Sequence, residues 1–324
     1  MFFNFTKLML ANTMMIGVIM TICSNNWISM WMGLEMSLLS FMPLMQTDNQ
    51  ISSESMIKYF IIQSIASTLF LFSISIMMIG VNMMILNLIS ISMLIKLGAA
   101  PFHNWILMII ESMSLFSIFT LLTVLKLPPI FIMYQINSST IIIPIMLGML
   151  LSSLLCLNQS SIRKTLGYSS IYNMSLILST VNFINISYSY MFIYSTILMF
   201  SMVLINKLKV NFINQMIIND FSMFMKISLW INMLSLSGFP LLLGFFNKIM
   251  IIQIMILNNQ IILVSILMVS SMFVTMFYLR LAFNCILTLS SFKKWTNVET
   301  KTVFYPLLVN LFSMPFFSLI SSIY

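Results

Sequence analysis

The sequence predicts an all-α polytopic membrane protein with about eleven transmembrane helices. Of its 324 residues, 60% are hydrophobic and only 6% are charged, whereas soluble domains carry roughly 25% charged residues. A chain with so few charges cannot cover a water-exposed surface. Apolar runs recur along the whole chain between short polar breaks, and their length of about 20 residues is what a helix needs to cross the hydrocarbon core.

The predicted membrane helices follow these apolar runs. They cover residues 3–23, 27–46, 56–80, 83–110 (broken near 98–101), 112–133, 139–157, 168–185, 188–206, 224–256 (broken near 238–244), 261–286 and 304–323. No cleavable signal with a basic start and a small-residue cleavage site is visible. We therefore expect the first run to be retained as a membrane helix.

The second predicted helix carries an acid, Glu35, near its centre, whereas the first has no ionisable group after Lys7. An acid at this depth is expensive when charged and is often functional. The alternative is a neutral glutamic acid hydrogen-bonded to a neighbouring helix. Asp48, Glu54 and Lys58 border the third helix and are expected to be solvated loop charges.

The fourth predicted helix is interrupted at ISMLIKLGAAPFHNW, residues 91–105. Here Lys96 follows a long apolar run and is followed at once by Gly98 and Pro101. Proline lacks an N–H, and its ring clashes with the carbonyl four residues earlier, so a continuous helix is not expected. A cation beside a helix break inside the membrane is typical of transporter ion sites. The alternative is a lysine whose long stem reaches the membrane surface.

Beyond this break, His103 begins a second half-helix, with Glu111 near its far end. His103 is either a possible proton relay, because histidine titrates near neutrality, or a hydrogen-bonded structural residue. On the fifth helix Lys126 lies deep in an apolar run and is followed by Pro128 and Pro129. These prolines predict a kink that would free carbonyls to accept from the Lys126 ammonium.

The sixth to eighth helices have no internal charge, and a loop holding Arg163 and Lys164 separates two of them. The ninth helix is interrupted at Gly238 and Pro240, and Lys248 lies on its second half. We expect Arg280, at the end of the tenth helix, to lie at the surface.

The two broken helices, four and nine, are five helices apart. A repeating unit of five helices must be inverted in the membrane, and inverted repeats with broken helices at matching places point to a midplane ion or substrate site. The predicted divisions are a first repeat, a second repeat, and a loop with a C-terminal transmembrane helix: residues 1–137, 138–288 and 289–324.

The chain is basic, with 14 Lys+Arg against 6 Asp+Glu and a formal net charge of +8. No basic run exceeds two residues, so we do not expect a nucleic-acid partner. All loop charge falls after even-numbered helices, on the face that holds the N-terminus. Because Lys and Arg mark the inner face, the N-terminus is predicted on the matrix or cytoplasmic side and the C-terminus on the other side.

Residues that could hold a metal or a redox centre are scarce. Cys23, Cys156 and Cys285 are far apart and have no metal-ligand spacing, and a single histidine, His103, rules out a bis-histidine haem within this chain. We expect neither a disulfide nor a bound metal.

The ionisable groups left in the predicted membrane interior are Glu35, Lys96, Lys126 and Lys248. Protonated lysines offer only donors and cannot form a metal cage. Desolvation disfavours the charged form of a buried lysine, so it can release its proton when a nearby charge changes. These groups are therefore suited to passing protons through the middle of the membrane. Serines on interior faces are candidates to hold linking waters: Ser64, Ser67, Ser90, Ser92, Ser235 and Ser237.

Four segments carry a family resemblance: KLGAAPFHNW (96–105), LLTVLKLPPIFIMYQI (121–136), SIRKTLGYSSI (161–171) and LSLSGFPLLLGFFNKIMIIQ (234–253). In this order they resemble the family of mitochondrial NADH–ubiquinone oxidoreductase chain 2. That family is one of the antiporter-like membrane subunits of respiratory complex I. The resemblance covers nearly the whole chain.

The resemblance implies that Glu35 is the acid of the second helix and Lys96 its partner on the first broken helix. Lys126 matches the central lysine and Lys248 the terminal one. It also implies proton translocation coupled to NADH:ubiquinone electron transfer, in the mitochondrial inner membrane, among other membrane-arm subunits and lipids. This chain is expected to bind no cofactor, and NADH, FMN, Fe–S clusters and ubiquinone are expected in other subunits. Under this reading the N-terminus faces the matrix and the C-terminus the intermembrane space.

Two departures from the family pattern are visible. The family often shows Gly-Leu-Pro-Pro where this chain has Gly238, Phe239, Pro240 and Leu241, which affects the shape of the break. Glu111 follows the run Ile-Leu-Met-Ile-Ile, which is less typical of the family, and this weakens any functional role for Glu111.

Three rival functions remain. A stand-alone cation/proton antiporter that selects sodium would need more oxygen ligands than one interior acid provides. A structural scaffold would use the buried charges only to orient helices. Quinone binding by this chain has no sequence signature.

Overall fold

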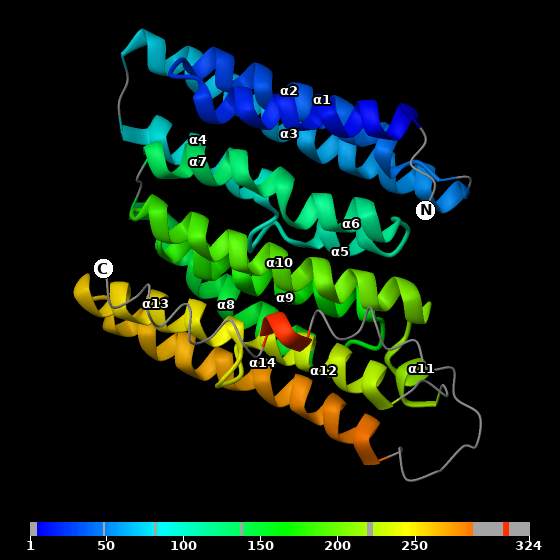
Figure 1. Cartoon of the computed structure of the whole chain (residues 1–324). Coiled ribbons are helices and arrows are strands. Elements are labelled where there is room, and N and C mark those ends of the chain that lie inside the picture. Colours follow the sequence, from blue (N-terminus) through cyan, green and yellow to red (C-terminus); the bar gives the residue numbers. More distant parts are fainter. Residues whose placement is uncertain are drawn as a thin grey trace. The chain divides into compact units, whose positions relative to one another are not determined.

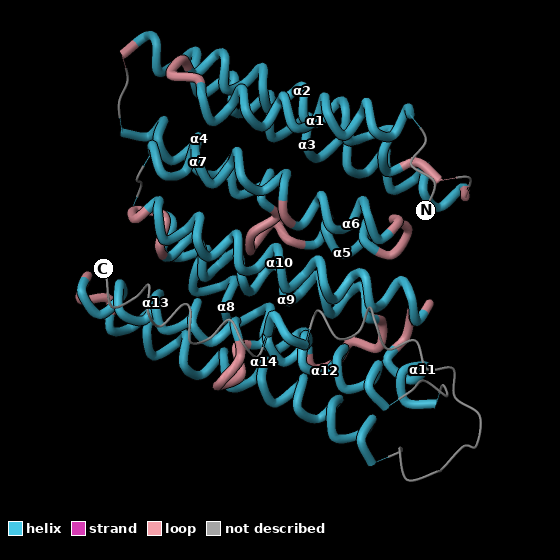
Figure 2. The backbone as a smooth tube through the Cα atoms, in the orientation of Figure 1, coloured by secondary structure: helices cyan, strands magenta, loops and turns pink. Residues whose placement is uncertain are grey.

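The structure is a computed structural model of the whole chain, and it describes residues 5–47, 49–80, 83–136, 139–218, 223–287 and 307–310. Within these ranges the chain is helical and has no strand, apart from one isolated bridge between Ser161 and Phe212. Long helices joined by short turns make up the described chain (Figures 1 and 2). The predicted all-α class is confirmed.

The chain divides into two compact units, residues 1–148 with 181–184, and residues 149–180 with 185–324. The boundary falls inside α8, eleven residues beyond the predicted division after residue 137 (148 − 137). The inverted relation between the predicted repeats stays a prediction.

The first unit consists of α1 to α7 and the start of α8. Its helices are α1 (Phe5–Cys23), α2 (Trp27–Met45), α3 (Gln50–Ile79), α4 (Met83–Leu97), α5 (Asn104–Ile110), α6 (Leu115–Leu122) and α7 (Leu127–Ile136), with 3₁₀ turns η1 (Val124–Lys126) and η2 (Ser139–Ile141). α1 packs on α2, α2 on α3, and α3 on α4 and α5, while α4 also packs on α7. The interruptions between α4 and α5 and between α6 and α7 therefore lie within one packed group of helices (Figure 1).

The second unit holds the remaining helices. They are the end of α8 (Ile142–Cys156), α9 (Ile162–Ser179), α10 (Ile184–Leu208), α11 (Ile213–Ile218), α12 (Met223–Ser237), α13 (Leu243–Leu257) and α14 (Ile261–Leu287). α12, α13 and α14 pack on one another, and α13 also contacts α9. The short helix α11 was not expected from the sequence. The predicted last helix, 304–323, lies outside the described residues except for 307–310, which are helical.

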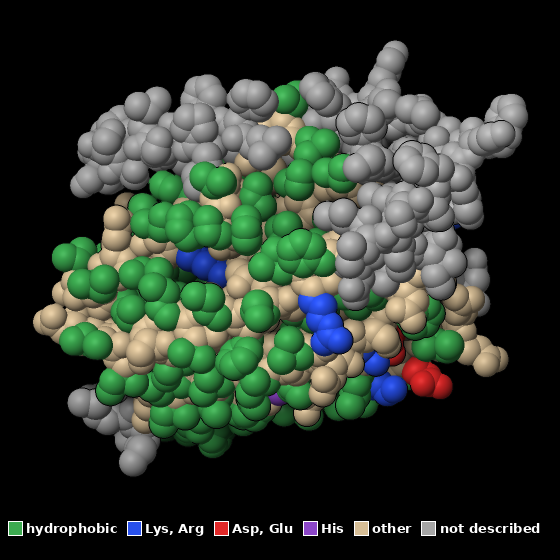
Figure 3. Space-filling view, turned by 90° about the horizontal axis from the view of Figure 1, so that it is seen from below, with side chains coloured by type: hydrophobic (Ala, Val, Ile, Leu, Met, Phe, Trp, Pro, Cys, Tyr) green, Lys and Arg blue, Asp and Glu red, His purple; other side chains and the backbone are tan. Residues whose placement is uncertain are grey.

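Six of the described helices are long and apolar enough to cross a membrane, and three shorter apolar helices accompany them. The shorter pieces include halves of the broken helices: α4, at 15 residues, spans only about 22 Å at 1.5 Å per residue, so it needs its continuation to cross about 30 Å of hydrocarbon. Hydrophobic side chains are spread over the described surface seen in Figure 3, and charged ones are few there. Both observations fit a polytopic membrane protein.

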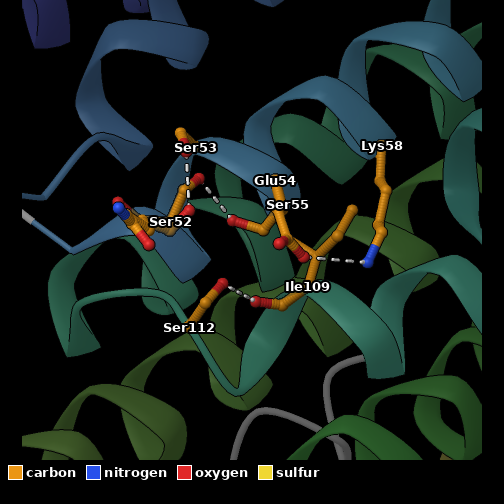
Figure 4. Close-up of polar contacts among 8 residues, drawn as sticks. Ser52, Ser53, Glu54, Ser55, Lys58, Ile109 and Ser112 are labelled. Atoms are coloured by element: carbon orange, nitrogen blue, oxygen red, sulfur yellow. Dashed lines mark hydrogen bonds and ion pairs between the residues drawn. The ribbon is translucent and has the colours of Figure 1, made fainter.

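The helices α3 and α9 begin well before their predicted starts, and four charges change place as a result. α3 begins at Gln50 and α9 at Ile162, so Glu54, Lys58, Arg163 and Lys164 lie on helices and not in loops. Glu54 and Lys58 form an i,i+4 ion pair of 3.8 Å on the exposed first turns of α3, near the end of α5 (Figure 4). Charged residues four apart are neighbours on a helix surface and support a helical turn there. They also lower the local hydropathy, so hydropathy alone places the start of the helix too late.

The helices α1 and α2 pack closely against each other at Gly17 and Gly33. A Cβ on Gly17 would lie 2.9 Å from the carbonyl oxygen of Gly33, and one on Gly33 would lie 2.8 Å from that of Gly17. Small residues at a membrane helix interface let two backbones approach closely. This contact fixes α2, the helix that carries Glu35.

Candidate functional site

Both broken helices end in the same hydrogen-bonded turn. After α4, Gly98 (φ 62°) donates to Ile95 and Ala99 donates to Leu94. After α12, Gly238 (φ 73°) donates to Ser235 and Phe239 donates to Leu234. This 5→2 and 6→1 pattern around a left-handed glycine is the Schellman motif. The predicted breaks at Gly98 and Gly238 are therefore confirmed, and Pro101 and Pro240 follow each stop.

Side chains from elsewhere in the first unit complete the end of α4. Trp105 Nε1 donates to the carbonyl oxygen of Ile95 at 3.1 Å, and Gln63 Nε2 donates to that of Lys96 at 3.4 Å. The last carbonyls of a helix have no partner within it, and an unsatisfied carbonyl at membrane depth costs several kcal/mol. These two bonds hold the break, and the Lys96 backbone with it, in place.

The interruption in the fifth predicted helix precedes its prolines. α6 ends at Leu122, a 3₁₀ turn covers Val124–Lys126, and Pro128 and Pro129 lie in the first turn of α7. Proline is tolerated there because the first N–H groups of a helix have no partner anyway. The kink is confirmed, but the expected hydrogen bonds to Lys126 are wrong. The backbone N–H groups of Lys126 and Leu127 already take the carbonyls of Thr123 and Val124.

Lys96 and Lys126 both line one small cavity of about 30 Å³. Both side chains are buried, at 8% and 3% exposure, so the surface-reaching alternative for Lys96 does not hold in this unit. Lys126 Nζ has no hydrogen-bond partner among the described residues. Ser37, Tyr59 and Gln63 contribute polar groups to the lining. A polar cavity of this size holds one or two waters, since about 10–15 Å³ suffices for one.

Glu35 is partly buried on α2 and acts on this cavity through its charge. Its carboxylate interacts electrostatically with Lys96 and with Tyr59, but it forms no ion pair within 4.0 Å with any described residue. A carboxylate that is near a lysine without touching it leaves the amine free to exchange its proton with other groups. The structure thus brings Glu35, Lys96 and Lys126 together in the first unit.

His103 is the N-cap residue of α5, and its Nδ1 lies 3.2 Å from the carbonyl oxygen of Pro101. Its side chain is buried beside the break. It is not among the residues that line the cavity between Lys96 and Lys126. This geometry favours the structural alternative over the relay.

Lys248 belongs to the second unit, where it lies against the break after α12. Its side chain is buried at 6% exposure, and its Nζ donates to the carbonyl oxygen of Ser237, the last residue of α12. The negative end of a helix dipole favours a cation at this place. The Nζ also lies 5.7 Å from the ring centroid of Tyr172, over its face.

Within the described residues no group of three His, Cys, Asp or Glu side chains could hold a metal ion. Arg280 is exposed, as expected. The side chains at the two buried sites offer amines, one carboxylate near Lys96, and hydroxyls, and each of these groups can hold or release a proton.

Comparison with known proteins identifies the family. A family model described as NADH:quinone oxidoreductase/Mrp antiporter, TM, matches residues 24–82 and 78–275. The chain is 34% identical to NADH-ubiquinone oxidoreductase chain 2 of Locusta migratoria over 99% of this chain and 96% of the relative. It is 35% identical to the chain of that name from Anopheles gambiae over 95% of each. The chain belongs to the NADH-ubiquinone oxidoreductase chain 2 family.

Solved structures show the same fold in more distant proteins. This chain 2 family member superposes on a chain of respiratory complex I from Thermus thermophilus with a TM-score of 0.75, at 18% identity, covering 96% of this chain and 78% of that one. It superposes on a chain of the archaeal membrane-bound sulfane sulfur reductase with a TM-score of 0.81, at 16% identity, covering 97% and 74%. At these identities the likeness shows the fold alone.

Several polar residues of this chain 2 family member escaped the sequence analysis. Gln63, Tyr59 and Ser37 line the cavity, and Lys226 on α12 is buried at 8% exposure. A glutamine inside an apolar run is a signal that could have been used, because a polar group in hydrocarbon needs a partner. Tyrosine and serine give no such signal, since both are common in helices of this kind.

Proposed function

We propose that this chain is a proton-translocating membrane subunit of complex I, embedded in the mitochondrial inner membrane. In this proposal NADH oxidation and ubiquinone reduction take place in other subunits, and this chain couples to them by moving protons. Its relatives carry the name NADH-ubiquinone oxidoreductase chain 2, and its fold is that of a chain in respiratory complex I. Other membrane-arm subunits and lipids are its partners.

One observation carries the proposal: Lys96 and Lys126 line the same small polar cavity without a carboxylate in contact with either among the described residues. An unpaired ammonium in hydrocarbon is expensive, and two ammoniums beside one cavity repel each other. The two lysines are therefore more stable when at least one of the amines is neutral than when both are protonated. Such a pair titrates as a unit, and its protons redistribute when an outside charge changes.

The first unit then works as a relay. The charge of Glu35 favours a proton on Lys96. When that charge is neutralised, the Lys96 ammonium gives a proton to a cavity water, and the water passes one of its own protons to the neutral amine of Lys126. Lys96 ends neutral, Lys126 ends as the ammonium, and the water is unchanged. Lys248 serves the same purpose beside the break in the second unit.

Replacement of Lys126 by Met tests the proposal in the assembled complex in sealed membrane vesicles. Methionine keeps the length of an apolar side chain and removes the proton site. We expect Lys126→Met to assemble normally and to lower the number of protons moved per NADH oxidised. The matched control is Lys58→Met, because Lys58 is 53% exposed on α3 and lies outside the cavity.

The outcomes separate this function from its rivals. A scaffold predicts that an assembled Lys126→Met complex moves as many protons per electron as the unmodified one, and that result would overturn the proposal. A stand-alone antiporter predicts sodium-dependent proton exchange without NADH, which the same vesicles can measure. Equal effects of Lys126→Met and Lys58→Met would point to assembly damage and also count against the relay.

The proposed membrane orientation follows from the loop charges, with the N-terminus in the matrix and the C-terminus in the intermembrane space. Protease treatment of inner-membrane vesicles of known sidedness tests it. A tag at the N-terminus should be cut only when the matrix face is outward, and the opposite result would reverse the topology.

A further inference from the structure

A groove of about 790 Å³ opens at one end of the second unit. Its walls are the loop that leads into α9, the start of α11 and the last turns of α14. The Ile213 N–H donates to the Ser160 carbonyl, and α11 packs on α14, so the three walls form one packed group at the same end of this unit (Figure 1). The volume lies in the range of ligand pockets, roughly 300–1,000 Å³.

The groove combines one cation with a polar wall and an apolar floor. Arg280, which is exposed, is the one charged residue among the described residues that line it. Gln159, Ser160 and Asn214 contribute the other polar groups, and the remaining lining side chains are apolar, most of them from α14. Arg280 forms no ion pair with any described residue. Its guanidinium therefore presents a planar set of N–H donors that a carboxylate or phosphate would match.

The charge around the groove is of one sign. The described charged residues of the second unit are all basic: Arg163, Lys164, Lys207, Lys209, Lys226, Lys248 and Arg280. Four of them, at positions 163, 164, 207 and 209, lie at the end that holds the groove, because the bridge between Ser161 and Phe212 joins the start of α9 to the segment after α10. This end of the second unit is therefore suited to an anion.

An exposed apolar stripe on α14 leads away from Arg280. Ile262, Val269, Met272 and Met276 lie three, four or seven residues apart on the face that also holds Arg280, and each of the four is more than half exposed. The 14 residues from Ile262 to Met276 correspond to about 21 Å at 1.5 Å per residue. One leaflet contributes about half of the 30 Å hydrocarbon core, so this stripe is long enough for an acyl chain.

The position of Arg280 on α14 matches the depth of a lipid headgroup. The apolar span of this helix is Ile261–Phe283, and Arg280 lies three residues before its end. A long arginine side chain at such a place extends its charged end toward the headgroup region while its stem stays on apolar surface. The groove thus brings a cation at headgroup level together with an apolar path into the membrane.

We infer that this groove binds an anionic phospholipid, with its phosphate on Arg280 and one acyl chain along the exposed stripe of α14. The inference goes beyond the proposed function and requires only that the chain spans a membrane. The guanidinium donates two N–H bonds to the phosphate, and the Ser160 hydroxyl and the Asn214 amide are placed to donate to its other oxygens. Basic pockets between membrane helices bind phospholipid headgroups in this way.

The charge of the surroundings predicts which phospholipid binds. Phosphatidylcholine carries a phosphate but also a quaternary ammonium, which the basic residues around the groove repel. Phosphatidylglycerol carries the phosphate without that cation. The site should therefore select phosphatidylglycerol over phosphatidylcholine, although both lipids have the same acyl chains.

The test uses the assembled complex in phosphatidylcholine nanodiscs that contain a small share of phosphatidylglycerol with a photoreactive diazirine in one acyl chain. Peptide mass spectrometry then locates the crosslinks. We expect labelling of α14 between Ile262 and Met276, and we expect Arg280→Gln to lower it about tenfold, because one charge-assisted contact is lost. The matched control is Lys207→Gln, which removes an exposed cation from the same end but not from the groove. It should label as the unmodified complex does.

Phosphatidylcholine with the same photoreactive chain is the lipid control, and it should label this stretch of α14 weakly. Equal labelling by the two lipids would overturn the inference, because α14 would then meet only bulk lipid. Equal losses in Arg280→Gln and Lys207→Gln would also overturn it, since they would indicate a general attraction of anionic lipid to the basic end.

Competition in the unmodified complex decides if Arg280→Gln does not assemble. Unlabelled phosphatidylglycerol should remove the labelling, whereas inorganic phosphate at matched ionic strength should not. Displacement by inorganic phosphate, or an acidic side chain of a neighbouring subunit on Arg280 in an experimental structure, would reject the lipid. None of these measurements involves proton movement, so a failure here leaves the proposed function standing.

Discussion

Gly238 leaves the space that the end of Lys248 occupies. A Cβ built on Gly238 would lie 2.4 Å from Cε of Lys248 and 2.9 Å from its Nζ. The same glycine has a φ of 73°, which L side chains rarely adopt. The residue that stops α12 is thus also the residue that admits the buried ammonium to the helix end.

Gly238→Ala is expected to displace Lys248 and to impair proton translocation. The methyl group adds a clash to a backbone strain of about 1–2 kcal/mol. The measurements are thermal stability of the complex and protons moved per NADH oxidised. Gly80→Ala is the control, because Gly80 also has a left-handed φ, of 99°, but nothing lies within 4 Å of a Cβ there. If both variants lowered the proton ratio equally, backbone strain and not the displaced lysine would be the cause.

Trp105→Phe is expected to destabilise the break after α4. The exchange leaves the Ile95 carbonyl without the bond from Nε1, although Gly98 still donates to it. Loss of one neutral hydrogen bond costs about 0.5–1.5 kcal/mol. Thermal unfolding of the purified complex measures this change. Trp31→Phe is the comparison, because the buried Trp31 Nε1 has no partner among the described residues. A larger loss of stability in Trp31→Phe than in Trp105→Phe would contradict the stabilising role of the Trp105 hydrogen bond.

Gly17→Ala is expected to push α1 away from α2. The added Cβ would lie 2.8 Å from the backbone nitrogen of Ser37, and a backbone atom cannot move aside as a side chain can. The expected result is less assembled complex on native gels. Ile16→Ala, at a 52% exposed position on the same helix, should assemble normally, and a comparable defect there would show general sensitivity of α1.

Glu54→Gln is expected to have almost no effect. The Glu54–Lys58 pair is exposed on both sides, and exposed i,i+4 pairs contribute about 0.3–0.5 kcal/mol, a contribution that salt screens. Thermal stability at low and high ionic strength measures it. A loss of stability above about 1 kcal/mol would contradict the description of Glu54–Lys58 as a weak surface ion pair.

The helix breaks and the buried charges could be predicted from the sequence because their signals are local. A glycine and a proline in an apolar run stop a helix by their own backbone chemistry. A lysine such as Lys126, far from both ends of its apolar run, cannot reach the membrane surface with its side chain. These features need no knowledge of which helices are neighbours.

The contacts around the charges could not be predicted in the same way. Gln63 reaches Lys96 from a different helix, and the cavity between Lys96 and Lys126 exists only because α4 packs on α7. Lys248 meets Ser237 because the chain turns back on itself after Gly238. Such contacts depend on helix packing, which hydropathy and spacing do not determine.

The helix starts were missed for a different reason. The helices α3 and α9 begin in polar segments, whose charged side chains lower the local hydropathy. Hydropathy marks where a helix enters hydrocarbon, whereas its hydrogen bonds begin one or two turns earlier.

The buried serines donate their single proton to carbonyls three residues earlier in their own helices, as Ser37, Ser169 and Ser270 do. Toward the interior they therefore present lone pairs alone, and any solvent molecule beside them must point a hydrogen at them. These serines can therefore accept a hydrogen bond from a buried donor, but they have no proton left with which to stabilise a buried carboxylate or another acceptor.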